Sequence, residues 1–298
     1  MPSVTSPLRT GLIGAGIGPS LSPALHEREA GELGLECRYE RFDLDVLGLG
    51  PADVGGLLAR ARGEGLVGVN VTHPVKQAVI AHLDELSADA AAIGAVNTVV
   101  FTAGRAVGHN TDWSGFRDGL LDGLPDAART RVVLLGAGGA GAAVAHALLR
   151  LEVGTVVVLD TDAARARALA DDLVARAGPG RAEARPATEA ADALAGADGL
   201  VHATPVGMAD HPGLPLPAEL LRPELWVADI VYRPLETVLL HHARARGCRT
   251  LDGGRMAVHQ AAEAFRLFTG LAPDPARMRR HLLELVAPGP GREGSRVA

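Results

Sequence analysis

The chain has 298 residues, of which 47% are hydrophobic and 21% charged, so it is long enough for two domains that each bury a core. Its net charge of −6 and its lack of a basic tract argue against nucleic acid or anionic lipid as a partner. No segment approaches the roughly 20 apolar residues of a membrane span, and the first ten residues lack the apolar core of a signal peptide, so we expect a cytoplasmic protein.

The first 112 residues predict a separate α/β domain. Strands are indicated at 10–16, 37–45 and 66–74, helices at 22–34, 51–65 and 75–93, and a hairpin at 95–112 that turns at Ala103 and Gly104. In the helix at 22–34, Ser22 is placed as the N-cap and Pro23 as the first helical residue. The apolar residues of 75–93 have the spacing of one amphipathic helix.

A second unit, over 113–252, begins with a linking helix at 113–124. Strand–helix pairs follow at 131–151 and 155–177, with further strands within 198–208 and 225–232. This alternation predicts a doubly wound parallel sheet of the Rossmann type. Helices at 255–269 and 274–286 are expected to pack back on the first domain, and the tail at 287–298 is expected to be disordered. The fold class is therefore α/β; the sequence leaves monomer and homodimer open.

Two glycine-rich stretches compete for a dinucleotide, "GLIGAGIGPSLSP" at 11–23 and "VVLLGAGGAGAAV" at 132–144. The fingerprint G-x-G-x-x-G must lead directly into a helix whose free N–H groups face the diphosphate. Only the second stretch does so, and its expected cofactor-binding residues are Gly136, Ala137, Gly138, Gly139, Ala140 and Gly141. The first stretch has the spacing G-x-G-x-G, and its helix is delayed to Pro23. We expect it to position the hydroxyls of Ser20 and Ser22 instead.

Asp160 ends the next predicted strand, 19 residues beyond Gly141, where an acid would bind the adenosine ribose. Its carboxylate can accept hydrogen bonds from both ribose hydroxyls of NAD. Beside the 2′-phosphate of NADP it would face a like charge, at a cost of about 4 kcal/mol for charges 4 Å apart at an effective dielectric constant near 20. Arg165 on the following helix would soften that repulsion, whereas Arg167 fits a solvated helix face. NAD is therefore predicted over NADP.

Rare residue types gather in one region. The chain has a single lysine, Lys76, among its 29 basic residues, and five of its six Lys, Asn and Gln residues lie between 70 and 110. An ammonium next to a carboxylate can exchange a hydroxyl proton during hydride transfer, while neighbouring amides orient the substrate. Lys76 and Asp112 are the candidate pair. Asp112 is equally well explained as the N-cap of the helix at 113, and one aspartate can serve both roles.

The chain resembles the shikimate dehydrogenase family, most closely its NAD-dependent quinate/shikimate branch. The matching stretches are "SLSP", "NVTHPVK", "GAVNTVV", "GHNTD", "GAGGAG", "ATPVGM", "DIVYRPLET" and "DGGRMAVHQAAEAFRLFTG", in family order over roughly residues 11–270. The resemblance implies an active site in the cleft between the two domains, with Lys76 and Asp112 as the catalytic pair. "LDTD" stands where NADP-using members carry an Asn-Arg-Thr-type sequence, which also favours NAD.

The resemblance assigns further residues to each ligand. Those implied for the substrate are Ser20, Ser22, Asn70, Thr72, Asn97, Tyr232 and Gln260. Those implied for the cofactor are Thr204, Pro205, Val206, Met208, Ile230, Gly253 and Met256. The chain departs from the family at His202, where Asn is usual, and in the form of the 11–18 loop. No set of histidines has a metal-ligand spacing, so no metal site is expected, and Cys37 and Cys248 are expected to be free thiols.

These observations predict an oxidoreductase that interconverts shikimate and 3-dehydroshikimate with NAD, with quinate and 3-dehydroquinate as a second pair. Three alternatives stay open. One is an NADP-dependent biosynthetic shikimate dehydrogenase, and another is a dehydrogenase of an amino-substituted shikimate or quinate. The third is a catalytically silent NAD-binding regulatory protein, against which the retention of Lys76 and Asp112 argues.

Overall fold

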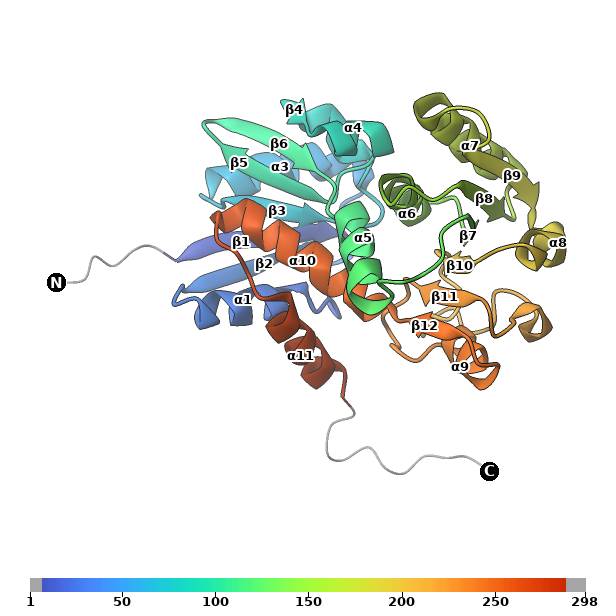
Figure 1. Ribbon diagram of the computed structural model, residues 1–298. Helices are drawn as coiled ribbons and strands as arrows, with labels where there is room; N and C mark the ends of the chain where they lie inside the picture. Colours follow the sequence, from blue (N-terminus) through green and yellow to red (C-terminus); the bar gives the residue numbers. More distant parts are fainter. Residues whose placement is uncertain (1–6, 288–298) are drawn as a thin grey trace.

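A mixed six-stranded sheet forms the N-terminal unit of the computed structural model, which describes residues 7–287 (Figure 1). Its order is β2-β1-β3-β5-β6-β4, and β5 runs antiparallel to both of its neighbours. The strands are β1 (Leu8–Gly14), β2 (Cys37–Asp43), β3 (Gly68–Val71), β4 (Glu85–Leu86), β5 (Thr98–Thr102) and β6 (Arg105–His109). The helices are α1 (Ser22–Glu32), α2 (Leu44–Leu47), α3 (Val54–Gly63) and α4 (Ala88–Ile93). The hairpin between β5 and β6 turns at Ala103 and Gly104, as predicted.

The single helix predicted over 75–93 is wrong. The structure has a short 3-10 helix at Ala78–His82, the strand β4 and the helix α4 in its place. Glu85 and Leu86 pair in parallel with Val107 and Gly108 of β6. This pairing outweighs the helical preference that the spacing of the apolar residues indicates.

The C-terminal unit has a second six-stranded sheet, of order β12-β11-β10-β7-β8-β9, and all of its neighbouring strands are parallel. The strands are β7 (Arg131–Leu135), β8 (Thr155–Asp160), β9 (Ala182–Pro186), β10 (Gly199–His202), β11 (Trp226–Asp229) and β12 (Arg249–Leu251). The helices are α5 (Asp112–Gly123), α6 (Gly139–Arg150), α7 (Ala163–Ala177), α8 (Ala190–Ala195) and α9 (Val238–Ala245). This strand order is that of the predicted doubly wound fold.

Apolar side chains cover both faces of the second sheet. Within β7, Val132 belongs to one buried cluster and Val133 to the other, and Val156 and Val157 of β8 divide in the same way. Strands covered on both faces are nearly continuously apolar, which is why these two were readily predicted. The edge strands β9 and β12 were not assigned from sequence, because "AEARP" and "RTL" lack such a run.

The last two helices, α10 (Gly253–Thr269) and α11 (Pro275–Val286), pack on the N-terminal unit (Figure 1). Val258 of α10 and Leu282 of α11 share a buried cluster with Leu25 of α1. Helix α10 also crosses α5 closely, since a Cβ at Gly115 would lie only 2.7 Å from Gln260 Cβ. Helices α5 and α10, which are the two connections between the units, therefore lie side by side. Of the tail expected at 287–298, all but the first residue lies outside the described residues.

Within residues 7–287, no helix is both long and apolar enough to cross a lipid bilayer. The same part of the chain contains no group of three or more His, Cys, Asp and Glu side chains that could hold a metal ion. Cys37 and Cys248 are both free, as expected.

Candidate active site

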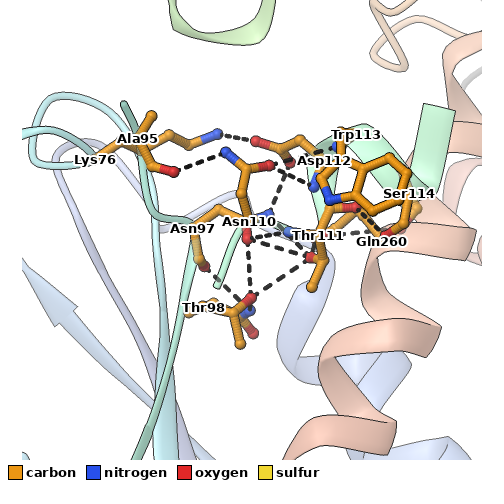
Figure 2. Close-up of polar contacts among 12 residues, drawn as sticks. Lys76, Ala95, Asn97, Thr98, Asn110, Thr111, Asp112, Trp113, Ser114 and Gln260 are labelled. Carbon is orange, nitrogen blue, oxygen red and sulfur yellow. Dashed lines mark hydrogen bonds and ion pairs between the residues drawn. The ribbon is translucent and has the colours of Figure 1, made fainter. Parts of the chain in front are cut away.

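Lys76 and Asp112 form an ion pair at the junction of the two units (Figure 2). Lys76 lies in the turn after β3, and Asp112 is the first residue of α5. Lys76 Nζ lies 2.6 Å from Asp112 Oδ2, and the side chains are 24% and 12% exposed. The pair is therefore largely shielded from water but still open to a small molecule, as a proton-exchanging group must be.

The structure separates the two roles considered for Asp112. Asp112 lies inside α5, whose N-cap residue is Thr111, so it is not the N-cap. Asn110 Oδ1 instead accepts hydrogen bonds from the amides of Asp112, at 3.0 Å, and Trp113, at 3.4 Å. Asn110 Nδ2 donates to the Ala95 carbonyl at 3.0 Å, which ties the start of α5 to the segment before β5. The carboxylate of Asp112 is thereby left to its side-chain partners.

Asn97 orients Asp112 through the carboxylate oxygen that Lys76 does not bind (Figure 2). Its Nδ2 donates to Asp112 Oδ1 at 2.9 Å and to Thr111 Oγ1 at 3.0 Å, and its Oδ1 accepts from the Thr111 amide at 2.7 Å. Thr111 Oγ1 also lies 3.5 Å from Gln260 Oε1 on α10. The structure thus brings three predicted residues, Asn97, Asp112 and Gln260, into one network with Lys76.

Asn70 is held by a residue that sequence reasoning missed. Tyr39 on β2 is 6% exposed, and its hydroxyl donates to Asn70 Oδ1 at 2.8 Å. Burial strongly raises the pKa of Tyr39, so the hydroxyl stays protonated and able to donate. Asn70 Nδ2 then donates to Thr98 Oγ1 at 3.0 Å. One signal was available: Tyr39 is one of only two tyrosines in the chain.

Of the two predicted serines, Ser20 lies on the loop after β1 and Ser22 begins α1. A Cβ at Gly14 would lie 2.3 Å from Thr72 Cγ2, so the end of β1, from which this loop leaves, packs directly on Thr72. Ser22 is the first residue of α1 rather than its N-cap, which is Leu21; the Ser22 amide instead donates to Ser20 Oγ at 3.3 Å. Neither serine is hydrogen-bonded to the Lys76–Asp112 pair in the part of the chain that the structure describes.

Tyr232 lies in the loop after β11 and is partly buried. Burial raises the pKa of its hydroxyl, and the charge of neighbouring Arg233 offsets only part of that rise. The Arg233 guanidinium donates to the Pro19 carbonyl. This contact brings the loop of Tyr232 next to the loop of Ser20 and Ser22.

The second glycine loop has the features that a diphosphate requires. Gly136 has φ +112°, and a Cβ there would lie 2.6 Å from the Ala203 carbonyl oxygen. A Cβ at Gly141 would lie 2.0 Å from the Gly136 carbonyl oxygen, so the helix start packs tightly on the turn. Gly138 and Gly139 face open space, and no side chain caps the first turn of α6. The N–H groups of that turn, which includes Gly139, Ala140 and Gly141, are therefore available to an anion.

Asp160 ends β8 directly beside this loop. Its Oδ2 accepts from the Ala137 amide at 2.7 Å and its Oδ1 from the Asp162 amide at 2.8 Å. Burial opposes ionisation of Asp160, but these two amides and the Arg165 charge outweigh it and lower its pKa. Arg165 Nη2 lies 3.5 Å from Asp160 Oδ1, and Arg165 Nε lies 3.1 Å from Asp162 Oδ2. The edge of the loop thus carries an ionised carboxylate with one exposed guanidinium beside it.

The remaining residues expected at the cofactor surround the same sheet edge. Thr204, Pro205, Val206 and Met208 form the turn after β10, next to Gly136, where a Cβ would lie 3.0 Å from Thr204 Cγ2. Ile230 follows β11 and meets the start of α10, where a Cβ at Gly253 would lie 2.4 Å from the Ile230 carbonyl oxygen. Met256 lies one turn further along α10. Free space at Gly138 and free helical amides fit a bound dinucleotide.

Comparison with known proteins identifies the family. Residues 12–99 match the shikimate dehydrogenase substrate-binding domain, and residues 254–283 match the shikimate 5′-dehydrogenase C-terminal domain. A shikimate dehydrogenase (NADP⁺) of Streptomyces avermitilis is 63% identical, over 93% of this chain and 95% of the relative. A quinate/shikimate dehydrogenase (NAD⁺) of Corynebacterium efficiens is 51% identical, over 92% of this chain and 97% of the relative.

A solved structure extends this likeness to the fold. The quinate dehydrogenase from Corynebacterium glutamicum in complex with NAD superposes with a TM-score of 0.89 at 48% identity. The match covers 94% of this chain and all of that one. Sequence and fold agree over both units: the chain belongs to the shikimate dehydrogenase family, whose members are oxidoreductases that act on cyclic alcohols.

Proposed function

We propose that this protein is an NAD-dependent dehydrogenase that interconverts shikimate and 3-dehydroshikimate, and quinate and 3-dehydroquinate. The observation that carries the proposal is the 2.6 Å pair of Lys76 and Asp112 where the two units meet. Hydride transfer from a ring alcohol needs a group that takes the hydroxyl proton, and the only lysine of the chain stands at this point. A bound nicotinamide would accept the hydride in oxidation and give it back in reduction.

Lys76 exchanges the proton and Asp112 holds Lys76 in place. In the direction of oxidation, the neutral Lys76 amine takes the hydroxyl proton while the C–H bond of the same carbon is broken. In reduction, the Lys76 ammonium returns that proton to the carbonyl oxygen. Asp112 keeps Nζ in one position, and Asn97 keeps Asp112 from rotating through its bond to Oδ1.

The other polar groups suit a polyol carboxylate. Ser20 and Ser22 are proposed to donate hydroxyl hydrogen bonds to the substrate carboxylate. Asn70, Thr72, Asn97 and Gln260 are proposed to bind the ring hydroxyls, with Tyr232 near the same pocket. A serine at position 22 supports shikimate as the first substrate, because relatives that use quinate well can carry Thr there.

The choice of NAD rests on Asp160. We infer that its ionised carboxylate, which the Ala137 amide holds, accepts the ribose hydroxyls of NAD and repels a 2′-phosphate. The NADP-dependent alternative is favoured by the NADP⁺ in the names of several relatives, among them three that are 55–63% identical to this chain. Arg165 would offset part of the repulsion in that case.

Initial rates of NAD⁺ and NADP⁺ reduction, each with shikimate and with quinate, test the proposal. Turnover with NAD⁺ and both polyols is expected. Turnover with NADP⁺ and shikimate alone would overturn the cofactor assignment and favour the biosynthetic alternative. A higher kcat/KM for an amino-substituted shikimate or quinate than for shikimate and quinate themselves would make the amino compound the preferred substrate. NAD⁺ binding without turnover of any of them would point to a regulatory protein.

A further inference from the structure

A chain of hydrogen bonds runs through the first sheet from β2 to the start of α5. Tyr39 Oη donates to Asn70 Oδ1 at 2.8 Å, and Asn70 Nδ2 donates to Thr98 Oγ1 at 3.0 Å. Thr98 Oγ1 donates to Asn97 Oδ1 at 3.0 Å, and Asn97 Nδ2 donates to Asp112 Oδ1 at 2.9 Å (Figure 2). These five residues are at most 8% exposed. The chain therefore connects β2 to the carboxylate of the ion pair.

The direction of all four bonds follows from the carboxylate at the end of the chain. The carboxylate of Asp112 can only accept, so Asn97 turns Nδ2 toward it and Oδ1 toward Thr98. The one hydroxyl proton of Thr98 then goes to Asn97, which leaves Thr98 Oγ1 as the acceptor for Asn70 Nδ2. Asn70 Oδ1 consequently faces Tyr39, whose hydroxyl must donate. All four donors point toward the carboxylate, and hydrogen bonds ordered in this way strengthen one another in a buried environment.

The Tyr39 hydroxyl maintains this order from the other end. Burial raises its pKa, so it keeps the proton that it donates. Without that donor, Asn70 Oδ1 would be buried without a partner, and the Asn70 amide would gain a hydrogen bond by turning over. Thr98 would then donate to Asn70 instead of Asn97. Asn97 would keep its bond from the Thr111 amide but lose its bond from Thr98, so its hold on the carboxylate would weaken.

Ring packing explains the aromatic ring of Tyr39 but not its hydroxyl. The ring packs against His26, with the ring centroids 5.0 Å apart, and a phenylalanine ring would pack in the same way. A buried hydroxyl costs free energy unless it is hydrogen-bonded, and the chain supplies that bond. We propose that Tyr39 is a positioning residue for the Lys76–Asp112 pair, on which it acts through the hydrogen-bond chain. This inference rests on the proposed function, in which Lys76 exchanges the substrate proton.

Two substitutions break the chain, and two others serve as controls. Tyr39→Phe removes only the hydroxyl and keeps the ring against His26. Thr98→Val breaks the chain in the middle, whereas Thr98→Ser keeps the hydroxyl there. Thr10→Val is the matched control, because Thr10 is 0% exposed and lies opposite Tyr39 in the pairing of β1 with β2. Thr10 Oγ1 donates to the Gly68 carbonyl at 2.9 Å, so this variant removes a buried hydroxyl of the same sheet that is not part of the chain.

Asparagine side chains report the state of the chain in the ligand-free, full-length protein. The sequence has three asparagines, Asn70, Asn97 and Asn110, so protein labelled with ¹⁵N-asparagine gives NMR signals from three side-chain NH₂ groups. Replacing each asparagine by aspartate in turn assigns them. Asn110 lies outside the chain, since its Nδ2 donates to the Ala95 carbonyl. The two chain-breaking variants are expected to move the signals of Asn70 and Asn97 and to leave that of Asn110 in place, and Thr10→Val should leave all three as in wild type.

Steady-state kinetics with shikimate and the preferred cofactor show whether the chain matters for turnover. One hydrogen bond is worth about threefold to tenfold in rate, so we expect kcat to fall by that factor in Tyr39→Phe and by at least as much in Thr98→Val. Thr98→Ser should recover most of the loss, and Thr10→Val should keep the wild-type kcat. KM for the cofactor should change less than about twofold in every variant, because the chain and the glycine loop lie in different units.

An Asn97 signal that stays in place in both chain-breaking variants would overturn the inference, as would moved signals with an unchanged kcat. Equal losses of kcat in Tyr39→Phe and Thr10→Val would also overturn it, since any buried hydroxyl of the sheet would then have the same effect. If Thr98→Val does not fold, the comparison of Tyr39→Phe with Thr10→Val decides. A wild type that reduces neither NAD⁺ nor NADP⁺ with shikimate or quinate would refute the proposed function instead, and the asparagine signals would still judge the chain.

Discussion

Asn97 Nδ2 lies 2.9 Å from Asp112 Oδ1, the carboxylate oxygen that Lys76 does not use. One oxygen of Asp112 thus accepts from the Asn97 amide, which fixes the carboxylate. The other binds the Lys76 ammonium, and the carboxylate in turn fixes that group. Asn97 cannot turn away, since its own Oδ1 accepts the Thr111 amide at 2.7 Å. The backbone at the start of α5 therefore holds Lys76 in position, although Lys76 itself lies on a turn of the other unit.

Replacing Lys76 by Met should abolish proton exchange while keeping the length of the side chain. We expect kcat to fall by about 10²–10⁴-fold, the range typical of general acid–base groups, with the affinity for NAD⁺ retained. Asp112→Asn should lower kcat less than Lys76→Met, because the lysine remains but loses its counter-charge. Steady-state rates measure both, and nearly full turnover by Lys76→Met would contradict the mechanism.

Substrate binding by Lys76 can be followed without turnover. Because Lys76 is the only lysine, protein labelled with ¹³C-lysine gives one side-chain Cε signal. Shikimate added to the cofactor-free enzyme is expected to shift this signal, and acetate at the same concentration is not. A signal that shikimate leaves unmoved would place the substrate away from the pair.

Asp160→Ser should reverse the cofactor preference. The substitution removes the acceptor for the ribose hydroxyls and the charge that opposes a 2′-phosphate, while Arg165 remains. We expect kcat/KM with NAD⁺ to fall about tenfold or more and kcat/KM with NADP⁺ to rise. Arg167→Ser on the exposed face of α7 is the control. An unchanged ratio of the two kcat/KM values in Asp160→Ser would show that the carboxylate does not select the cofactor.

Local patterns in the sequence were sufficient for the glycine loop and for the strands covered on both faces. The φ of +112° at Gly136 and the packing of Gly141 on the Gly136 carbonyl both arise within one turn, so the fingerprint alone predicts these two glycines. The carboxylate of Asp160 follows from its place at the end of the next strand. These features depend on neighbours close in the chain, and the structure places them side by side.

Features that depend on distant neighbours were missed. Leu86 is extended because β6 pairs with it, which the helical spacing of 75–93 does not reveal. Asn110, not Asp112, binds the free amides at the start of α5, since its side chain is anchored on the Ala95 carbonyl. Tyr39 supports Asn70 from a strand 31 residues away. Each case is decided by a partner that a local pattern does not contain.

Stability should fall below pH 6.5 because of His26. This side chain of α1 is 1% exposed and packs against Tyr39, Phe265 and Phe268. Burial lowers its pKa from 6.5 to about 3, so the unfolded chain binds this proton first as the pH falls. Linkage then gives a loss of about 2 kcal/mol between pH 7 and pH 5 from this residue.

Urea unfolding at pH 7 and pH 5 measures this loss. His26→Phe keeps a ring in the cluster but cannot be protonated, so the difference between the two pH values should shrink by about 2 kcal/mol. His241→Asn on the exposed face of α9 should leave the difference as in wild type. An equal pH dependence in His26→Phe and wild type would mean that His26 is not the group responsible.

A buried ion pair fastens the C-terminal helices to the first unit. Glu29 of α1 is 0% exposed, and Arg277 of α11 binds it through Nε at 3.0 Å and Nη2 at 2.6 Å. The Asp274 amide adds a third hydrogen bond to Glu29, at 2.8 Å. Arg277→Met leaves the carboxylate buried without its counter-charge, so we expect a loss of about 3–5 kcal/mol in the free energy of unfolding.

The same helices provide the control. Arg28 of α1 and Glu284 of α11 form an ion pair whose side chains are 46% and 58% exposed, so Arg28→Met should cost less than about 1 kcal/mol. The double variant Glu29→Leu with Arg277→Met removes both buried charges and should recover much of the loss. Denaturant titration compares the three variants. If Arg277→Met is no more destabilising than Arg28→Met, the docking of α11 does not depend on this pair, and the apolar contact of Leu25 with Leu282 must carry it.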